Sequence, residues 1–248
     1  MGGRIQTESP ADLLWNMHNW RNLQTEVGNI LSQCGFNVEV EKKVKTTRGE
    51  VEIDVYAEEK IKGRKYIIIC ECKFWKSKIP QTVIHSFRTV VSDLGANVGY
   101  LISLKGFQSG AQKASEYTNI ELLTWENLQK IFEESWLENY FCKKMAKEID
   151  PLFTYTEPIS TAVFSMTKKL TEEEQYKFIE LKERYEDFAF LCMQFTHYTR
   201  IFSSRPYPTL PLIDHLVDQK LLKTVPEEIL NADNYLEFHA KVVEHGLK

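Results

Sequence analysis

The sequence predicts an α/β fold, with a mixed sheet flanked by helices and a mostly helical C-terminal extension. Two strand-like segments joined by a polar turn lie between residues 49 and 73, and the first alternates polar and apolar side chains. The second contains Ile67, Ile68 and Ile69 in succession, which is typical of a strand buried on both faces. Beyond residue 80, helical and strand patterns alternate, which favours parallel strands.

The first predicted element is a helix that begins at Ser9, where a serine cap precedes Pro10. Its apolar residues recur at helical spacing as far as Leu31, and Gly35 is suited to end it. The remaining elements of this part follow in order: a half-exposed strand over residues 36–44, the hairpin of residues 49–73 with its turn at 60–64, a helix over 80–94, a strand over 98–104, a short helix ending near Tyr117, a strand over 120–123 and a helix capped by Thr124 that continues through Phe132.

The second half of the chain is acidic and is predicted to be mostly helical. Residues 151–165 are rich in Thr and aromatic side chains and predict an extended segment. Thr171 and Glu174 have the spacing of a capping box and predict the start of a helix that reaches about Phe202. A proline-rich loop over 203–211 and helices over 212–222 and 226–245 complete the expected order. We therefore expect one domain at residues 1–140 and a mostly helical extension of unknown role at residues 141–248.

The composition is that of a folded globular protein, with 43% hydrophobic and 27% charged residues. No apolar run approaches the roughly 20 residues of a membrane helix, and the N-terminus lacks the apolar stretch of a secretion signal. We expect a cytoplasmic protein without a membrane partner. Cys70 and Cys72 form one Cys-X-Cys pair with no second pair to complete a zinc site, so we expect core packing. A net charge of −4 argues against a protein that coats nucleic acid.

Charged side chains lie where the two hairpin strands end. Asp54 is on the first strand, and Glu71 and Lys73 share one face of the second, while Cys70 and Cys72 point the opposite way. Because burying unpaired charge is costly, this ending predicts either partners or chemistry. On the first strand, strict alternation predicts one face for Glu50, Glu52 and Asp54 and the other for Val51, Ile53 and Val55.

An acid, followed by acid-X-Lys at the end of the next strand, resembles the PD-(D/E)XK nuclease superfamily. The segments Ile79-Pro-Gln-Thr-Val, Val90-Val-Ser-Asp-Leu-Gly-Ala, Gly99-Tyr-Leu-Ile-Ser and Gly106-Phe-Gln-Ser-Gly-Ala narrow the resemblance to the catalytic domain of Mrr-type restriction endonucleases, over about residues 19–130. The proline that usually precedes the first catalytic acid is replaced by Ile53. The resemblance implies a restriction-endonuclease-like fold and hydrolysis of DNA phosphodiester bonds with Mg²⁺, for which Mn²⁺ can substitute.

The resemblance also assigns roles to residues. Asp54 and Glu71 would bind the metal together with the backbone carbonyl of Cys72, because Mg²⁺ prefers hard oxygen ligands. Lys73 would orient the attacking water and stabilise the charge that develops on the phosphate. Gln81 is a further catalytic candidate, since it begins the helix that follows this strand.

Five further residues are weaker candidates. Glu26, on the first helix, would be an additional metal ligand, and an ordinary surface glutamate is an equally weighted alternative. Lys76 and Lys78 would contact DNA, against the alternative of a solvated edge. Trp75 would stack on a base or hold its loop in place, and we favour the loop. His85 is a less favoured general base, because a single helix histidine is more often structural or exposed.

We therefore expect an endodeoxyribonuclease of the restriction or anti-phage defence kind. Two alternatives stay open: a nuclease-fold nucleic-acid-binding or assembly subunit that does not cut, and a repair or junction-resolving nuclease with the same chemistry. The complete set of Asp54, Glu71 and Lys73 argues against the first alternative. Besides DNA, the resemblance points to a homodimer or higher oligomer, and the lack of a recognisable DNA-reading motif points to a partner protein that supplies specificity.

Overall fold

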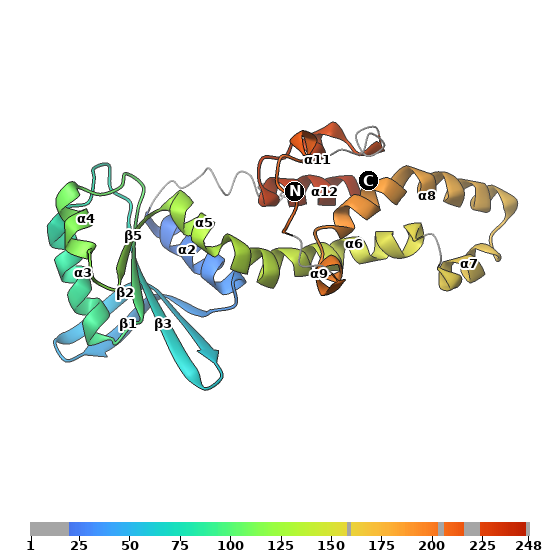
Figure 1. Ribbon diagram of the computed structural model, residues 1–248. Coiled ribbons are helices and arrows are strands. Elements are labelled where there is room, and N and C mark those ends of the chain that lie inside the picture. Colours follow the sequence, from blue (N-terminus) through green and yellow to red (C-terminus); the bar gives the residue numbers. More distant parts are fainter. Residues whose placement is uncertain (1–19, 158–159, 203–205, 216–223, 247–248) are drawn as a thin grey trace, which may run out of the picture. The chain divides into compact units, whose positions relative to one another are not determined.

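The computed structural model describes residues 20–157, 160–202, 206–215 and 224–246. These residues divide into two compact units, one within residues 17–140 and one within residues 141–248 (Figure 1). The helix start expected at Ser9 lies outside the described residues. None of the described helices is both long and apolar enough to cross a membrane.

The first unit is built on a five-stranded sheet in the order β1-β2-β3-β4-β5. The first three strands are antiparallel neighbours, whereas β3, β4 and β5 pair in parallel, so the predicted mixed sheet is confirmed. The strands are β1 (Asn37–Thr46), β2 (Gly49–Ile61), β3 (Arg64–Lys73), β4 (Val98–Ser103) and β5 (Ile120–Thr124).

The β2–β3 hairpin forms where the sequence predicts it. Its turn is Lys62-Gly63, and both residues have positive φ, 49° and 80°, as a two-residue hairpin turn of the right twist requires. β3 then runs through the centre of the sheet, where Ile68 and Ile69 are buried. The predicted central position of this strand is confirmed.

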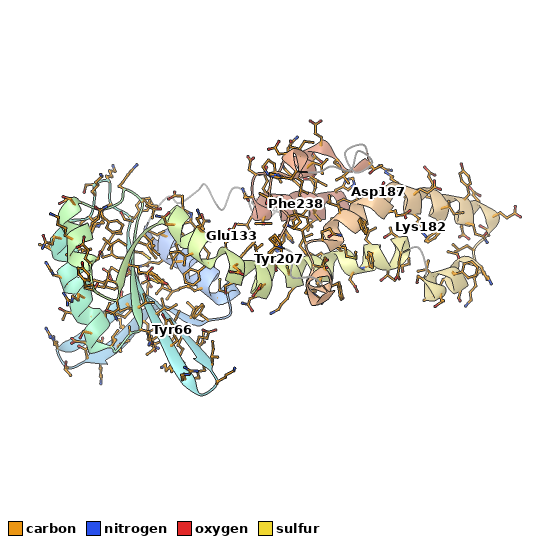
Figure 2. All side chains as sticks on the ribbon, in the orientation of Figure 1. Tyr66, Glu133, Lys182, Asp187, Tyr207 and Phe238 are labelled. Atoms are coloured by element: carbon orange, nitrogen blue, oxygen red, sulfur yellow. The ribbon has the colours of Figure 1, made fainter. Side chains whose placement is uncertain are left out.

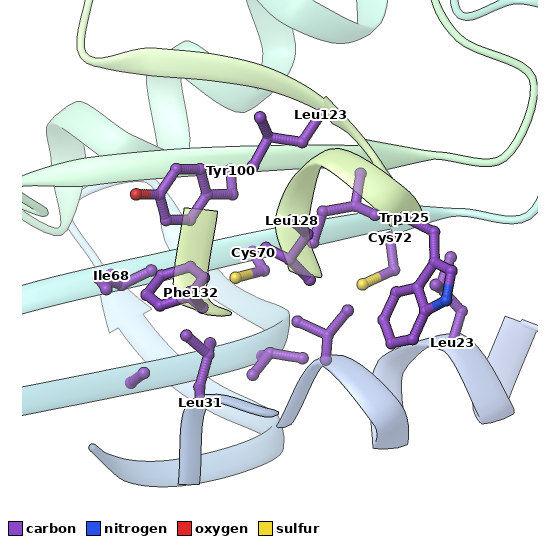
Figure 3. Close-up of a cluster of buried hydrophobic side chains, with 14 of the residues drawn as sticks. Leu23, Leu31, Ile68, Cys70, Cys72, Tyr100, Leu123, Trp125, Leu128 and Phe132 are labelled. Atoms are coloured by element: carbon purple, nitrogen blue, oxygen red, sulfur yellow. The ribbon is translucent and has the colours of Figure 1, made fainter. Parts of the chain in front are cut away.

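Helices cover both faces of the sheet (Figure 1). On one face, α2 (Trp20–Gln33) and α5 (Trp125–Trp136) enclose an apolar cluster with Cys70 and Cys72 (Figure 3), which confirms that these cysteines are packed in the core. On the other face, α3 (Gln81–Asp93) and α4 (Ser109–Ser115) enclose a second cluster. The second cluster includes Ile53, Ile69, Ile79, Ile84, Phe87, Leu101 and Ala111.

The strict alternation predicted along β2 is wrong at Asp54. Ile53 packs in the α3/α4 cluster, whereas Val55 packs in the α2/α5 cluster, although the two should share a face. The cause is an interruption opposite Asp54. Val40 pairs with Val55 and Lys42 with Ile53, but the intervening Glu41 has φ +54° and is not paired with Asp54. The local break turns the strand, so the face of Asp54 cannot be read from sequence parity.

The second unit is helical and has an aromatic core. Phe141, Phe188, Phe195 and Phe238 are fully buried, and the ring centroids of Phe195 and Phe238 lie 4.3 Å apart (Figure 2 labels Phe238). The chain enters it through a π-helical turn over Leu137–Phe141. The helices are α6 (Cys142–Thr156), α7 (Thr161–Thr167), α8 (Glu172–Met193), α9 (His197–Phe202), a 3₁₀ turn over Leu212–Asp214, α11 (Glu227–Leu230) and α12 (Tyr235–Gly246).

Three predictions for this half are corrected. The extended segment expected over 151–165 is helical instead, because α6 continues through Pro151 and buries Met145, Ile149 and Thr156 along one side. The capping box of Thr171 is confirmed, but α8 ends at Met193 and α9 is separate.

The third correction concerns the helix predicted over 226–245, which is two helices. Asn234 caps α12, and its Oδ1 accepts a hydrogen bond of 2.9 Å from the backbone N–H of Glu237. A side chain that satisfies a free helix N–H favours a new helix start at this point. Most of the helix expected over 212–222 lies outside the described residues.

Candidate active site

The β2–β3 ladder stops just before the predicted acids, and the two strands part there. The last backbone pair joins Val55 to Cys70. Beyond it, the carboxylate Oδ2 of Asp54 accepts a hydrogen bond of 2.7 Å from the backbone N–H of Cys72. The side chain thus takes the place of a ladder carbonyl. Because a paired strand residue directs its N–H and C=O to the same neighbour, the Cys72 carbonyl faces this opening too. We call the opening between Asp54 and Cys72 the fork.

Glu71 and Lys73 lie beside the fork, on the α3/α4 face of the sheet. They share strand parity with Ile69, which packs in the α3/α4 cluster. The Lys73 Nζ contacts Oε1 of Glu71 as an ion pair, and both side chains are largely buried, at 21% and 26% exposed. The structure therefore brings the three predicted residues, Asp54, Glu71 and Lys73, to one end of the hairpin.

Asp54 and Glu71 are partly buried and are balanced by the single positive charge of Lys73, so the site carries an excess of negative charge. Burial, and then the negative charge of Glu71, raise the pKa of Asp54 from its ordinary value of 3.8 to about 6. Hydrogen bonds from the Cys72 N–H and Gln24, and the positive charge of Lys73, oppose this rise without cancelling it. The fork holds Asp54 firmly in place but does not neutralise its charge.

Gln24 is a site residue that the sequence reasoning missed. Its side chain, on α2, is 4% exposed and hydrogen-bonds the Asp54 carboxylate. A signal was present, because Gln24 lies on the apolar stripe of Leu23, Val27 and Leu31, where a buried amide needs a partner. Sequence alone does not identify that partner, which lies 30 residues further along the chain.

The donors at the fork suit a hard divalent cation. Two carboxylates and a main-chain carbonyl are the ligands from which Mg²⁺ sites are built, with water completing the octahedron. A cation would also relieve the repulsion that raises the pKa of Asp54. In the described part of the chain, no group of three or more His, Cys, Asp and Glu side chains is arranged to hold a metal ion. A cation at the fork would therefore have two carboxylates and keep several waters.

Glu26 and Gln81 stand apart from these groups. Glu26 follows Gln24 by two residues, about 200° around the helix, and its described hydrogen bond is with Asn29, at 3.5 Å. Gln81 begins α3 with an exposed side chain, whose Nε2 lies 3.0 Å from Nε2 of His85. The structure places Gln81 on the α3/α4 side of the sheet, with no described contact to Asp54, Glu71 or Lys73.

The three candidate DNA-contacting residues follow β3 directly. Trp75, Lys76 and Lys78 are exposed on the loop between β3 and α3. Trp75 leaves 42% of its surface accessible, which does not favour the expected role of packing the loop down. All three residues follow Lys73 in the loop between β3 and α3 and are accessible to a ligand from solvent.

A mixed sheet that places an aspartate beside a Glu-X-Lys at the end of the neighbouring strand defines a PD-(D/E)XK nuclease domain. Residues 16–132, just under half of the chain, match the family model Mrr_cat, described as a restriction endonuclease. This match confirms the resemblance predicted from the sequence, and it supports a nuclease domain of restriction endonuclease type in this part of the chain.

The other comparisons add no functional argument. No curated protein matches the chain. A crystal structure of a protein of unknown function, AF1548, is similar over 68% of this chain and 98% of that one, at 19% identity and a TM-score of 0.39.

Proposed function

We propose that the protein is a Mg²⁺-dependent endonuclease that hydrolyses phosphodiester bonds in DNA. The observation that carries the proposal is the convergence of Asp54, Glu71 and Lys73 at the fork. Asp54, Glu71 and the Cys72 carbonyl would hold the metal. A bound Mg²⁺ would polarise the scissile phosphate and lower the pKa of an attacking water.

Other residues near the site would position the metal ligands and stabilise charge on the phosphate. The Cys72 N–H and Gln24 fix the orientation of the Asp54 carboxylate, so that little reorganisation is needed when a cation arrives. Lys73, held by Glu71, supplies a positive charge on the same face of the sheet, where it would orient water and stabilise negative charge on the phosphate. Gln81 would contribute a neutral hydrogen bond from the start of α3.

The test is nicking of supercoiled plasmid DNA by the purified full-length chain. We expect cleavage with Mg²⁺ or Mn²⁺ and none with EDTA. Asp54→Ala, Glu71→Ala and Lys73→Ala should each abolish cleavage while the circular dichroism spectrum stays that of the wild type. Glu52→Gln is the matched control, because Glu52 is an exposed acid on the same strand whose described ion pair is with Lys43, at 3.9 Å, outside the fork.

The outcomes separate the alternatives. If all three alanine variants cut like the wild type, the catalytic proposal is wrong. A gel shift without Mg²⁺-dependent nicking would instead identify a nuclease-fold binding subunit. Preference for four-way junctions over linear duplex would assign the same site to a repair or junction-resolving nuclease. A host-defence role is tested by phage plaque assays in cells that express the wild type or Lys73→Ala.

A further inference from the structure

The α3/α4 side of the first unit has an unusual charge balance. From Lys73 to Ser115 the chain carries six of its 31 Lys and Arg residues and one of its 35 acidic residues, although the whole chain has a net charge of −4. The one acid, Asp93, is paired with Arg48 outside this segment at 3.2 Å. By contrast, α5 on the opposite face has three glutamates and one lysine. Among the helical segments that cover the two faces of the sheet, the basic excess therefore lies on the α3/α4 side.

The basic residues begin at the edge of the sheet that holds Lys73. β3 and β4 are parallel, and Lys73 pairs with Ser103, so the loops after both strands leave the same edge. These loops are joined, because Ile79 N–H donates to Gly106 at 3.0 Å and Gln108 N–H donates to Ile79 at 3.0 Å. The exposed residues Lys76, Lys78 and Lys105 lie on these two joined loops.

Two further bases, Arg88 on α3 and Lys113 on α4, continue this surface away from the edge. Arg88 lies on the same flank of α3 as Gln81, seven residues earlier. That flank adjoins α4, because a Cβ built on Gly110 would lie 3.1 Å from Oε1 of Gln81. Both helices follow parallel strands and leave the edge in the same direction. Lys113 is therefore about 6 Å and Arg88 about 10 Å beyond the helix starts.

These bases are available to an external anion. Lys76, Lys78, Arg88, Lys105 and Lys113 are exposed, and the described residues form no ion pair with any of them. Exposed hydroxyl and amide side chains lie among them, which are the neutral groups that accompany Lys and Arg in contacts with nucleic-acid phosphates. These neutral side chains are Thr82, Ser86, Ser109 and Gln112.

We propose that this surface, which we call the basic track, binds the phosphate backbone of the DNA duplex that flanks the cleaved bond. The inference rests on the proposed function, because the track begins beside Lys73 and extends the same site. It names Arg88, Lys105 and Lys113 as phosphate contacts. A line of charges that runs about 10 Å from the helix starts spans more than one phosphate, since phosphates recur every few ångströms along a duplex.

The experiment measures how binding of a fluorescein-labelled 30-base-pair duplex depends on salt, with EDTA present so that no cleavage occurs. The test variant is Arg88→Gln/Lys105→Gln/Lys113→Gln in the full-length chain. Each lost phosphate contact lowers the slope of log K against log salt by about 0.9, so the triple variant should lose up to about 2.7. We also expect a tenfold or greater loss of affinity at 0.1 M salt, with an unchanged thermal midpoint because all three side chains are exposed.

The matched control is Lys60→Gln/Lys62→Gln/Arg64→Gln, which changes the net charge by the same amount. These residues lie at the β2–β3 turn, and the nearest of them, Lys60, is six residues from Asp54 along β2, which is about 20 Å in a strand. We expect a salt slope within about 0.5 of the wild type, because fewer than one contact should be lost. Equal losses in both variants would attribute binding to net charge and overturn the basic track.

Cleavage of the same DNA with Mg²⁺ separates this inference from the proposed function. If the wild type cuts and the track variant binds and cuts like it, the basic track is wrong and the nuclease stands. If the wild type binds with the expected slope loss in the variant but never cuts, the track stands and the nuclease proposal fails. A wild type that neither binds nor cuts duplex DNA overturns both. Stronger displacement by single-stranded RNA than by duplex DNA also overturns the assigned ligand.

Discussion

Replacing Asp54 by Asn should stabilise the metal-free protein, although Asp54 is the first proposed catalytic acid. The pKa of this carboxyl is about 6 in the folded state, against an ordinary value of 3.8. A difference of about 2 units corresponds to about 3 kcal/mol between the protonation states. Asp54 is only partly buried, so water reaches its side chain and reduces the expected gain to about 1–2 kcal/mol. Asn can still accept the hydrogen bond from the Cys72 N–H.

The pH dependence of this effect has a definite sign. A carboxyl whose pKa is raised on folding binds its proton more tightly in the native state, so stability falls as pH rises from about 4 to about 6. Above about pH 7 the cost is complete and constant. Wild type and Asp54→Asn should therefore be equally stable near pH 4, diverge between pH 4 and 6, and stay separated at pH 8.

Tryptophan fluorescence is a selective assay for this unit. Four of the five tryptophans, at positions 20, 75, 125 and 136, lie within residues 17–140, and the described residues of the C-terminal unit contain none, so urea or thermal unfolding followed at this signal reports mainly on the nuclease domain. At pH 8 in EDTA we expect the midpoint of Asp54→Asn to exceed that of the wild type by several degrees, since 1 kcal/mol shifts a domain of this size by about 4 °C.

Adding Mg²⁺ should reverse the order. A cation held by Asp54 stabilises only the wild type, by about 2.7 kcal/mol at a hundredfold excess over its dissociation constant. Glu52→Gln, exposed on the same strand, should stay within about 0.5 kcal/mol of the wild type in every condition. The reasoning is refuted if Asp54→Asn is no more stable than the wild type in EDTA at pH 8, or if Mg²⁺ stabilises both proteins equally.

Variants at three further positions test the site and the packing of the sheet that carries it. Lys73→Ala should reduce the rate of plasmid nicking at least about 100-fold, and Lys73→Arg should restore little of it, because guanidinium does not reproduce the compact ammonium charge. Gln24→Leu removes a hydrogen bond that lowers the pKa of Asp54, so nicking should fall about tenfold and the acidic limb of its pH profile should move to higher pH. Gly99→Ala should destabilise the domain by about 1–3 kcal/mol in urea titrations, because the new Cβ would lie 2.5 Å from Val91 Cγ2 and 2.9 Å from Phe87 Cε1.

Local chemistry explains which elements could be predicted from the sequence. The β2–β3 hairpin carries its own signals, namely alternation, a glycine turn at Gly63 and an isoleucine run. The start of α8 is equally local, because the Thr171 side chain and Glu174 satisfy each other's backbone donors within one turn. Such features need no information from distant parts of the chain.

Three features that the sequence did not predict depended on distant contacts. Residues 151–156 have strand-like composition, but Thr156 and the preceding apolar side of α6 are buried against the rest of the unit, and packing overrides propensity. The face of Asp54 depended on a break at Glu41 in the neighbouring strand. The partner of Gln24 was fixed only when α2 packed on the sheet. Sequence identified Asp54, Glu71 and Lys73, but not the groups that hold Asp54 in position.

The electrostatics of the fork favour a cation site over a structural ion-pair network. In a network built for stability, ion pairs and hydrogen bonds lower the pKa of each acid. Lys73 contacts Glu71, whereas the pKa of Asp54 is raised, first by burial and then by the charge of Glu71. The fold nevertheless holds Asp54 through the Cys72 N–H and the buried side chain of Gln24. An acid that is fixed in place but under-compensated in charge is stabilised by an added dication. For this reason Mg²⁺ titration of stability is as direct a test of the site as cleavage itself.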